Sequence, residues 1–303
     1  MSAGAAALPG TAFNARQLWM LLFVTVVWGL NWPVLKIGVS GYPPLSFRAL
    51  SMWGGLPILW AVTVWLKVPL RVPRSDWPEL VKLTLTNMLV WHVVAIVALQ
   101  SLSSGRAAIL GYTMPIFSAL WGMALFGQRL TPRQQLGVGA AAGGVGLLLW
   151  HEFARLAGRP EAAAGMLFAA AIWALGTQQL RHARSSAHTL ALVWWMSVIA
   201  TLVLSALAWG LERPRWGPPP AAVWAAITYN AVLIFGFAHA TWFSLARSLP
   251  PLASTLSVMM IPVLGVFVGA GWLGEVLHWQ DWSAVCLMVV AIASVLWPAK
   301  NSR

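Results

Sequence analysis

Stretches of predominantly apolar residues recur along the whole chain, and short polar joints separate them. A helix needs about 20 such residues to cross the hydrocarbon core of a bilayer. Charged residues make up only 9% of the 303 residues, whereas a soluble domain carries roughly 25%. A soluble core cannot hide this much apolar surface, so we expect the solvent of this chain to be lipid.

The apolar stretches predict an all-α integral membrane protein with ten transmembrane helices. The run after Arg16 is too long for the apolar region of a cleaved signal peptide, so we interpret it as a retained first span. The expected spans are 17–37, 44–66, 78–99, 104–126, 132–151, 162–181, 188–210, 220–241, 250–272 and 279–297.

Lysine and arginine are unevenly distributed over the two sides that these spans define. Twelve lie on the side of the N-terminus and seven on the other. Because basic joints stay in the cytoplasm, both termini are expected there. The net charge of +12 does not indicate a nucleic-acid partner, because the basic residues separate apolar segments instead of forming one patch.

An internal repeat divides the chain into residues 1–156 and 157–303, with five expected spans each. Five is an odd number, so the second half enters the membrane from the opposite side. Inverted repeats of this kind are typical of alternating-access transporters with a midplane site. A shift of 147 positions places Met114-Pro115-Ile116 on Ile261-Pro262-Val263, Phe126–Leu130 on Leu273–Leu277, and His92 on His239.

Three patterns resemble the EamA-type family of the drug/metabolite transporter (DMT) superfamily. They are Trp-Gly-x-Asn at residues 28–31, the prolines Pro115 and Pro262, and Gly274-Glu275 before the last span. The resemblance implies a ten-helix, inverted-repeat carrier of small metabolites in the bacterial inner membrane. The first half departs from the family pattern with Gln128 in place of Glu. The tryptophan content is similar to the YddG-like branch, which exports aromatic and other apolar amino acids.

The first span carries an amide and a proline in an apolar run. Pro33 has no N–H to donate, so it frees carbonyls one turn back, near Gly29. Asn31 brings two donors and an acceptor to the same place. We interpret this as a bent helix beside a wet cavity; the alternative is a packing kink with Asn31 bonded to a neighbouring helix.

A second polar cluster lies in the third span. Asn87 and Trp91 are four residues apart and share a helical face, and His92 follows about 100° round. The repeat pairs His92 with His239, which follows Tyr229 in the eighth span. We expect two related polar corners of one chamber; the alternative is two independent packing histidines.

A chamber lined by tryptophan, tyrosine and methionine suits flat or apolar side chains. We expect alternating access to bend the spans at Pro33, Pro115 and Pro262. The predicted substrate contacts are Trp28, Asn31, Asn87, Trp91, His92, Tyr112, Trp173, Gln178, Tyr229, His239 and Met259.

All seven acidic residues fall in joints or at span ends. Because coupled carriers usually keep a carboxylate at depth, an uncoupled facilitator is expected. Proton coupling through His92 or His239 is the alternative. Lys36, Arg48 and Arg106 are expected to snorkel from the outer span ends; alternatively, one of them holds a substrate carboxylate there.

The sequence therefore favours an exporter of small amphiphilic metabolites, most of all aromatic or apolar amino acids. Alternatives are a multidrug or nucleotide-sugar carrier, or a membrane-embedded enzyme or assembly protein. No nucleophile motif or metal-ligand spacing occurs, so we expect no enzyme activity, metal or cofactor. The small-residue ridge of Gly139 and Gly143 fits helix packing within the fold, or else a homodimer face.

Overall fold

The computed structural model of the chain describes residues 15–154, 160–183, 185–248 and 260–296, and every regular element in these ranges is helical, as predicted. Up to residue 154 the elements are α1 (Ala15–Gly41), α2 (Pro44–Trp65), η1 (Arg74–Asp76), α3 (Trp77–Thr84), η2 (Leu85–Leu89), η3 (Trp91–Ala95), α4 (Ile96–Leu99), α5 (Ser104–Gly111), α6 (Met114–Phe126) and α7 (Pro132–Ala154). From residue 160 they are α8 (Pro160–His182), α9 (Thr189–Glu212), η4 (Arg213–Arg215), α10 (Ala221–Tyr229), η5 (Asn230–Ala238), α11 (His239–Ser248), α13 (Met260–Leu273) and α14 (Trp279–Leu296).

Seven helical segments among the described residues are long and apolar enough to cross a bilayer. A shorter apolar helix covers Ile261–Leu273, and α7 and α14 follow the remaining predicted ranges. The multi-pass character is thus confirmed, while the count of ten spans stays a prediction. The seven segments are Ala15–Gly41, Pro44–Trp65, Arg74–Leu99, Ser104–Phe126, Pro160–His182, Thr189–Arg215 and Ala221–Leu245.

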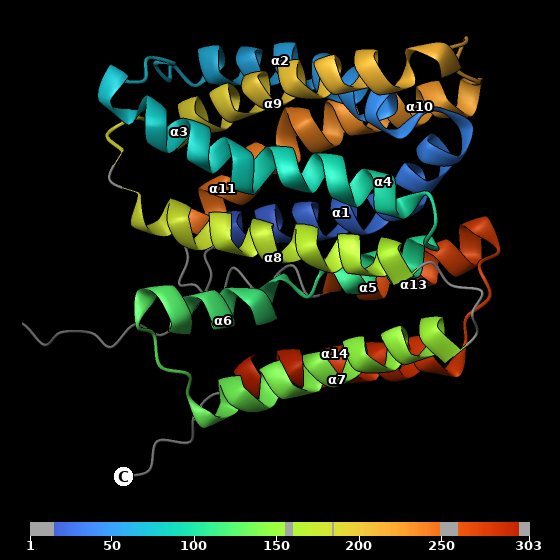
Figure 1. Cartoon of the computed structure of the whole chain (residues 1–303). Coiled ribbons are helices and arrows are strands. Elements are labelled where there is room, and N and C mark those ends of the chain that lie inside the picture. Colours follow the sequence, from blue (N-terminus) through green and yellow to red (C-terminus); the bar gives the residue numbers. More distant parts are fainter. Residues whose placement is uncertain (1–14, 155–159, 184, 249–259, 297–303) are drawn as a thin grey trace, which may run out of the picture.

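Helix α1 runs through the middle of the molecule (Figure 1), where it packs against α5, α10, α11 and α13. Gly29 permits the contact with α13, because a Cβ atom at this position would lie only 2.8 Å from the Cβ of Leu264. Close approach of two helix backbones therefore explains the glycine of the Trp-Gly-x-Asn pattern.

Two glycines end helices in the left-handed conformation, which favours glycine because it lacks a Cβ. Gly127 follows α6 with a φ of 63°, and Gly274 follows α13 with a φ of 65°. The 147-residue shift places one glycine on the other. The two halves therefore share a local geometry as well as a sequence pattern.

The three predicted hinge prolines have different surroundings. Pro33 lies inside the unbroken helix α1. Pro115 lies in the first turn of α6, directly after the interruption at residues 112–113, where its missing N–H is not needed. Pro262 lies in the first turn of α13. Pro115 thus marks a real break in the fourth predicted span, and bending at the three prolines stays a prediction.

Two helical passages contain π turns that the sequence does not predict. They are η2 and η3 in the third passage and η5 in the eighth. The 147-residue shift aligns these two regions in sequence. A π turn widens the helix by closing i→i+5 hydrogen bonds, and such turns are frequent at functional sites.

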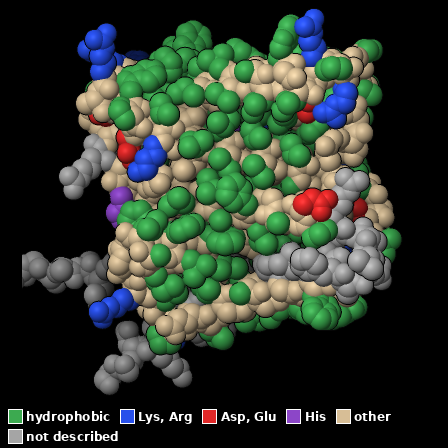
Figure 2. Space-filling view, viewed as in Figure 1, with side chains coloured by type: hydrophobic (Ala, Val, Ile, Leu, Met, Phe, Trp, Pro, Cys, Tyr) green, Lys and Arg blue, Asp and Glu red, His purple; other side chains and the backbone are tan. Residues whose placement is uncertain are grey.

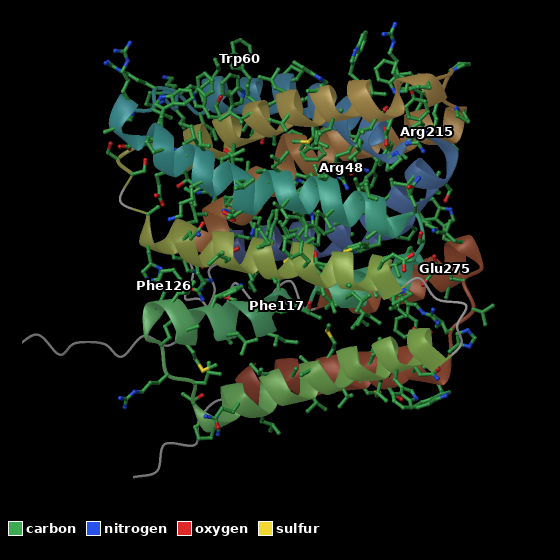
Figure 3. All side chains as sticks on the ribbon, viewed as in Figure 1. Arg48, Trp60, Phe117, Phe126, Arg215 and Glu275 are labelled. Atoms are coloured by element: carbon green, nitrogen blue, oxygen red, sulfur yellow. The ribbon has the colours of Figure 1, made fainter. Side chains whose placement is uncertain are left out.

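The face in Figure 2 is covered largely by hydrophobic side chains, with the charged side chains gathered toward its two ends. In Figure 3, Trp60 points outward from α2, and half of its surface is exposed. Arg48, on the same helix, lies inside the helical body. An apolar flank between two charged ends fits the thickness profile of a bilayer.

Helices α7 and α14 pack side by side along one edge of the molecule (Figure 1). A Cβ added at Gly144 would lie 3.5 Å from the Cα of Ala284, and one at Gly143 would lie 3.7 Å from Cδ1 of Leu287. A Cβ added at Gly139 would meet no described heavy atom within 4 Å. Packing within the fold therefore uses part of the small-residue ridge, and a homodimer through the remainder stays a prediction.

Candidate functional site

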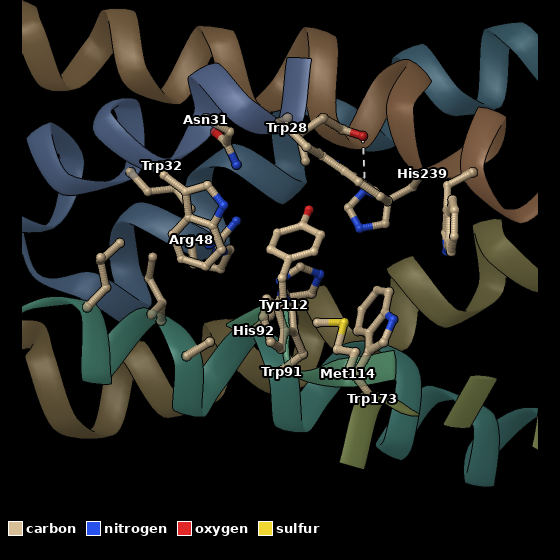
Figure 4. A pocket seen from close by; sticks show the side chains of 16 residues that line it. Trp28, Asn31, Trp32, Arg48, Trp91, His92, Tyr112, Met114, Trp173 and His239 are labelled. Atoms are coloured by element: carbon tan, nitrogen blue, oxygen red, sulfur yellow. Dashed lines mark hydrogen bonds between the residues drawn. The ribbon is translucent and has the colours of Figure 1, made fainter. Parts of the chain in front are cut away.

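A cavity, called the chamber below, lies among helices from both halves of the chain (Figure 4). About 80 Å³ of it is open to the centres of water molecules, and one water needs roughly 10–15 Å³ by this measure. The chamber thus has room for several waters. Its lining residues are Trp28, Asn31, Trp32, Leu35, Arg48, Trp91, His92, Ala95, Ile96, Leu99, Tyr112, Met114, Trp173, Ile234, His239 and Trp242.

Many of the predicted substrate contacts meet at this chamber. They come from α1, η3, α8, α11 and the break between α5 and α6. Residues chosen by helical spacing and the internal repeat thus line one cavity, and substrate contact at these residues stays a prediction. The predicted residues on the chamber wall are Trp28, Asn31, Trp91, His92, Tyr112, Trp173 and His239.

The structure places three predicted contacts behind the wall. Asn87 donates to the carbonyl of Leu83 at 3.2 Å. The amide of Gln178 donates to the carbonyl of Ser118 at 2.9 Å. The hydroxyl of Tyr229 donates to the Val27 carbonyl at 2.7 Å, inside the helix that carries the freed carbonyls. Gln178 and Tyr229 thus join neighbouring helices beside the chamber, whereas Asn87 is satisfied within its own helix.

Met259, another predicted contact, lies outside the described residues.

The two repeat-related histidines lie side by side in the chamber wall. Their ring centroids are 5.6 Å apart, and both side chains are almost fully buried. Nδ1 of His239 lies 2.9 Å from the carbonyl oxygen of Ile234, and its ring stacks on Phe235. Neither ring nitrogen of His92 has a hydrogen-bond partner among the described residues. One histidine is thus held by its own helix, and the other can serve a ligand.

Aromatic rings form most of the remaining wall. Trp91 meets Trp173 edge-on at 5.6 Å, and Trp28 lies 5.6 Å from Trp242. Across the chamber, Trp32 and Tyr112 form another edge contact at 6.3 Å. Such rings offer both faces and edges, so the wall can accept a flat apolar group and attract a cation.

Arg48 corrects a sequence expectation. Its position near the start of α2 suggested a side chain reaching for the membrane surface, but it is 3% exposed and lines the chamber. Nη1 lies 3.5 Å from Oδ1 of Asn230, and the guanidinium carbon lies 5.7 Å from the centroid of Phe235. The sequence offered one signal of a buried role for Arg48: it lies in an apolar run with no aspartate or glutamate nearby in sequence.

Sequence reasoning also missed Trp32, Met114 and Trp242 on the wall. Trp32 lies one helical turn after Trp28, and Trp242 lies three residues after His239. Both spacings place the second ring on the same helical face as the first. The signal was therefore present, but the abundance of tryptophan in the chain obscured it.

Two carboxylates, one buried and one partly buried, tie helix ends together at one end of the molecule. Glu212, at the end of α9, accepts hydrogen bonds from the backbone N–H groups of Leu45 and Ser46 at 3.0 and 2.7 Å. Glu275, beyond α13, accepts from the backbone N–H and hydroxyl of Ser104 at 2.7 and 2.9 Å. Each carboxylate caps a helix N-terminus in the other half of the chain.

A second cavity continues the chamber toward the His182 end of α8. It shares Tyr112, Met114, Trp173 and Trp242 with the chamber and extends past Pro115 to Arg181. The described residues contain no group of three or more His, Cys, Asp or Glu side chains that could hold a metal ion. The arrangement is thus suited to holding a small molecule between packed helices.

Relatives of this chain are transporters. It is 27% identical over 293 residues to the uncharacterized inner membrane transporter YedA of Escherichia coli, with 92% of each chain covered. It is 24% identical over 268 residues to the "Probable terminal-alkyne amino-acid exporter" of Streptantibioticus cattleyicolor. That alignment covers 86% of this chain and 87% of the relative.

The fold also matches a protein of known crystal structure with a TM-score of 0.73 at 21% identity, covering 95% of this chain and 100% of that one. At this identity the likeness concerns the fold alone. Residues 16–150 and 161–297 each match the EamA-like transporter family. Because these two copies together span most of its length, the chain belongs to the EamA-like transporter family of multi-pass membrane proteins.

Proposed function

We propose that this protein exports small amphiphilic metabolites, most of all aromatic or apolar amino acids, as the YddG-like branch does. The observation that carries the proposal is the chamber, whose wall combines aromatic rings with a few buried polar groups. Aromatic walls suit flat side chains, and isolated polar groups fix orientation. The name of the Streptantibioticus relative, an amino-acid exporter, supports the same substrate class and direction.

The proposed architecture has ten spans in two inverted halves, 1–156 and 157–303, with both termini in the cytoplasm. One family match falls in each half, and the two left-handed glycines and the two π regions follow the same repeat. In this arrangement the carboxylates Glu212 and Glu275 lie at the outer end. Their hydrogen bonds then close the chamber on the outer side, and the second cavity extends it toward the cytoplasm. Alternating access requires one state of this kind.

Transport is proposed to be uncoupled. No aspartate or glutamate lines the chamber among the described residues, and carriers coupled to protons or sodium usually keep a carboxylate at depth. Among the described residues of the chamber wall, the facing pair of His92 and His239 is the alternative route for protons. An imposed proton gradient decides between the two: a facilitator's net flux follows the substrate gradient alone.

The test is counterflow in liposomes that contain the purified protein. Vesicles loaded with unlabelled phenylalanine are expected to accumulate external labelled phenylalanine transiently, and a proton gradient is expected to leave the initial rate unchanged. Protein-free vesicles are the control. Absence of exchange for phenylalanine, tryptophan and leucine would remove the amino-acid proposal, whereas accumulation driven by the proton gradient would remove only the facilitator.

A nucleotide-sugar carrier is less well supported, because a diphosphate needs several cations and Arg48 is the only lysine or arginine on the described chamber wall.

A further inference from the structure

The guanidinium of Arg48 is buried with little to neutralise it. Its one hydrogen bond within the described residues is the 3.5 Å contact with Asn230, and its Nε has no partner. No described carboxylate lies within 4.0 Å of it. A buried charge without a partner is strongly unfavourable, so charged groups inside membrane proteins generally serve function.

Neighbouring basic residues at the same end are satisfied in ways that Arg48 is not. Nζ of Lys36 donates to the carbonyls of Leu99, Gln100 and Leu102 at 3.1, 3.0 and 2.8 Å. Nε of Arg106 lies 3.7 Å from a carboxylate oxygen of Asp281. Lys36 caps a helix end and Arg106 forms an ion pair, so burial without a strong partner is particular to Arg48 among these three residues.

Hydrogen-bonding groups without partners also occur elsewhere on the chamber wall. Oδ1 of Asn31, on α1, is buried without a donor, and both ring nitrogens of His92 are unpartnered among the described residues. Figure 4 shows Asn31, Arg48 and His92 around the same space. The chamber wall therefore holds a cationic donor beside an amide whose nitrogen faces the space in Figure 4. Turning this amide about its terminal torsion presents Oδ1 instead, and a zwitterion complements the resulting pair of donor and acceptor.

We infer that Arg48 and Asn31 form a head-group subsite for α-amino acids, in which Arg48 binds the carboxylate and Asn31 Oδ1 accepts from the ammonium. The rings of Trp28 and Trp32 beside Asn31 add a cation–π attraction for the ammonium. The apolar side chain then lies among Trp91, Trp173 and Met114. This inference rests on the proposed function and narrows its substrates to molecules with a free carboxylate.

The experiment uses three probes that share a phenyl group: phenylalanine, 3-phenylpropionate without the ammonium, and phenethylamine without the carboxylate. Neutral forms of the last two cross bilayers unaided, so all three are measured by binding. The apparent Kd comes from the concentration dependence of the melting temperature of the purified full-length protein in detergent. Wild-type protein is expected to bind phenylalanine most tightly.

The variants separate the two ends of the head group. Arg48→Gln is expected to raise the Kd of phenylalanine and 3-phenylpropionate about tenfold or more, because charged hydrogen bonds are lost, and to leave phenethylamine within about twofold. Asn31→Leu is expected to raise the Kd of phenylalanine and of phenethylamine and to leave the Kd of 3-phenylpropionate unchanged. Arg106→Lys, outside the chamber wall, is the matched control and should change none of the three.

Three results would overturn the subsite: equal weakening of all three probes by Arg48→Gln, no weakening at all, or wild-type protein that prefers phenethylamine. If Arg48→Gln does not unfold cooperatively, Arg48→Lys decides, because it keeps the charge but loses the two-pronged geometry and should show the same selective pattern. If the vesicles show no exchange although the purified protein keeps the selective binding pattern, transport of phenylalanine is refuted and the subsite stands. If the vesicles exchange phenylalanine but the selective binding pattern is absent, only the subsite is refuted.

Discussion

Trp91 shows what a single side chain contributes to the chamber. Its ring meets Trp173 edge-on at 5.6 Å, and it lies close to α5, where a Cβ at Gly111 would come within 3.1 Å of it. The ring therefore both faces the chamber and spaces two helices. Its loss enlarges the site and removes one aromatic partner for a substrate ring.

Replacing Trp91 by alanine is expected to raise the Kd of phenylalanine roughly two- to tenfold, since an aromatic pair contributes about 0.5–1.5 kcal/mol beyond its buried area. Trp60→Ala is the matched control, because this ring is half exposed on the outer surface of α2. The Kd of phenylalanine is measured for both variants from the concentration dependence of the melting temperature. Unchanged binding by Trp91→Ala would remove this ring from the substrate site.

Helical spacing and the repeat together bring residues such as Trp28 and His239 to one cavity wall, where their ring centroids lie 6.0 Å apart. The expectation that Arg48 reaches the membrane surface is wrong for a physical reason. Distance from the helix start gives depth, but the rotation of α2 about its axis decides whether a side chain meets lipid or protein. That rotation is set by packing against α9 and η5, which one sequence does not reveal.

At the scale of helices, the third passage departs from the regular α-helix on which the pairing of Asn87 with Trp91 was based. Their spacing of four residues predicts a common face only in a regular α-helix. The intervening turns are π-helical, with i→i+5 hydrogen bonds. Trp91 lines the chamber and Asn87 does not, and nothing in the composition of residues 85–95 predicts the π turns.

The cap that Glu275 forms on α5 is a testable link between the halves. Glu275→Gln weakens charge-assisted hydrogen bonds to Ser104 at a positive helix end, so a loss of about 0.5–2 kcal/mol of stability is expected. The melting temperature of the ligand-free protein measures it.

Glu79→Gln is the control for the Glu275 variant, because its 3.9 Å pair with Lys82 is exposed and should matter little. Equal melting temperatures for the Glu275 and Glu79 variants would contradict the cap.

At the scale of the whole molecule, the apolar stretches and the repeat predicted a helical, multi-pass protein with one site between its halves. The chamber lies where helices of both halves meet, with the carboxylates of Glu212 and Glu275 joining helices at one end and a second cavity at the other. The state of the two ends could not be predicted, because side-chain contacts between distant segments decide it.

The most direct test of alternating access is the reactivity of a cysteine in the chamber wall. Ala95→Cys is placed in a Cys286→Ser background, since Cys286 is exposed. Val97→Cys, two residues further along and 44% exposed, is the matched control. Oriented vesicles are treated with a membrane-impermeant thiol reagent from either side, with and without phenylalanine.

The cysteine at position 95 is expected to react from both sides, and phenylalanine is expected to slow its labelling. Labelling of the cysteine at position 97 is expected to be insensitive to phenylalanine. A cysteine at position 95 that reacts from neither side, or at one unchanged rate with saturating phenylalanine, would contradict a substrate chamber that opens to each side in turn.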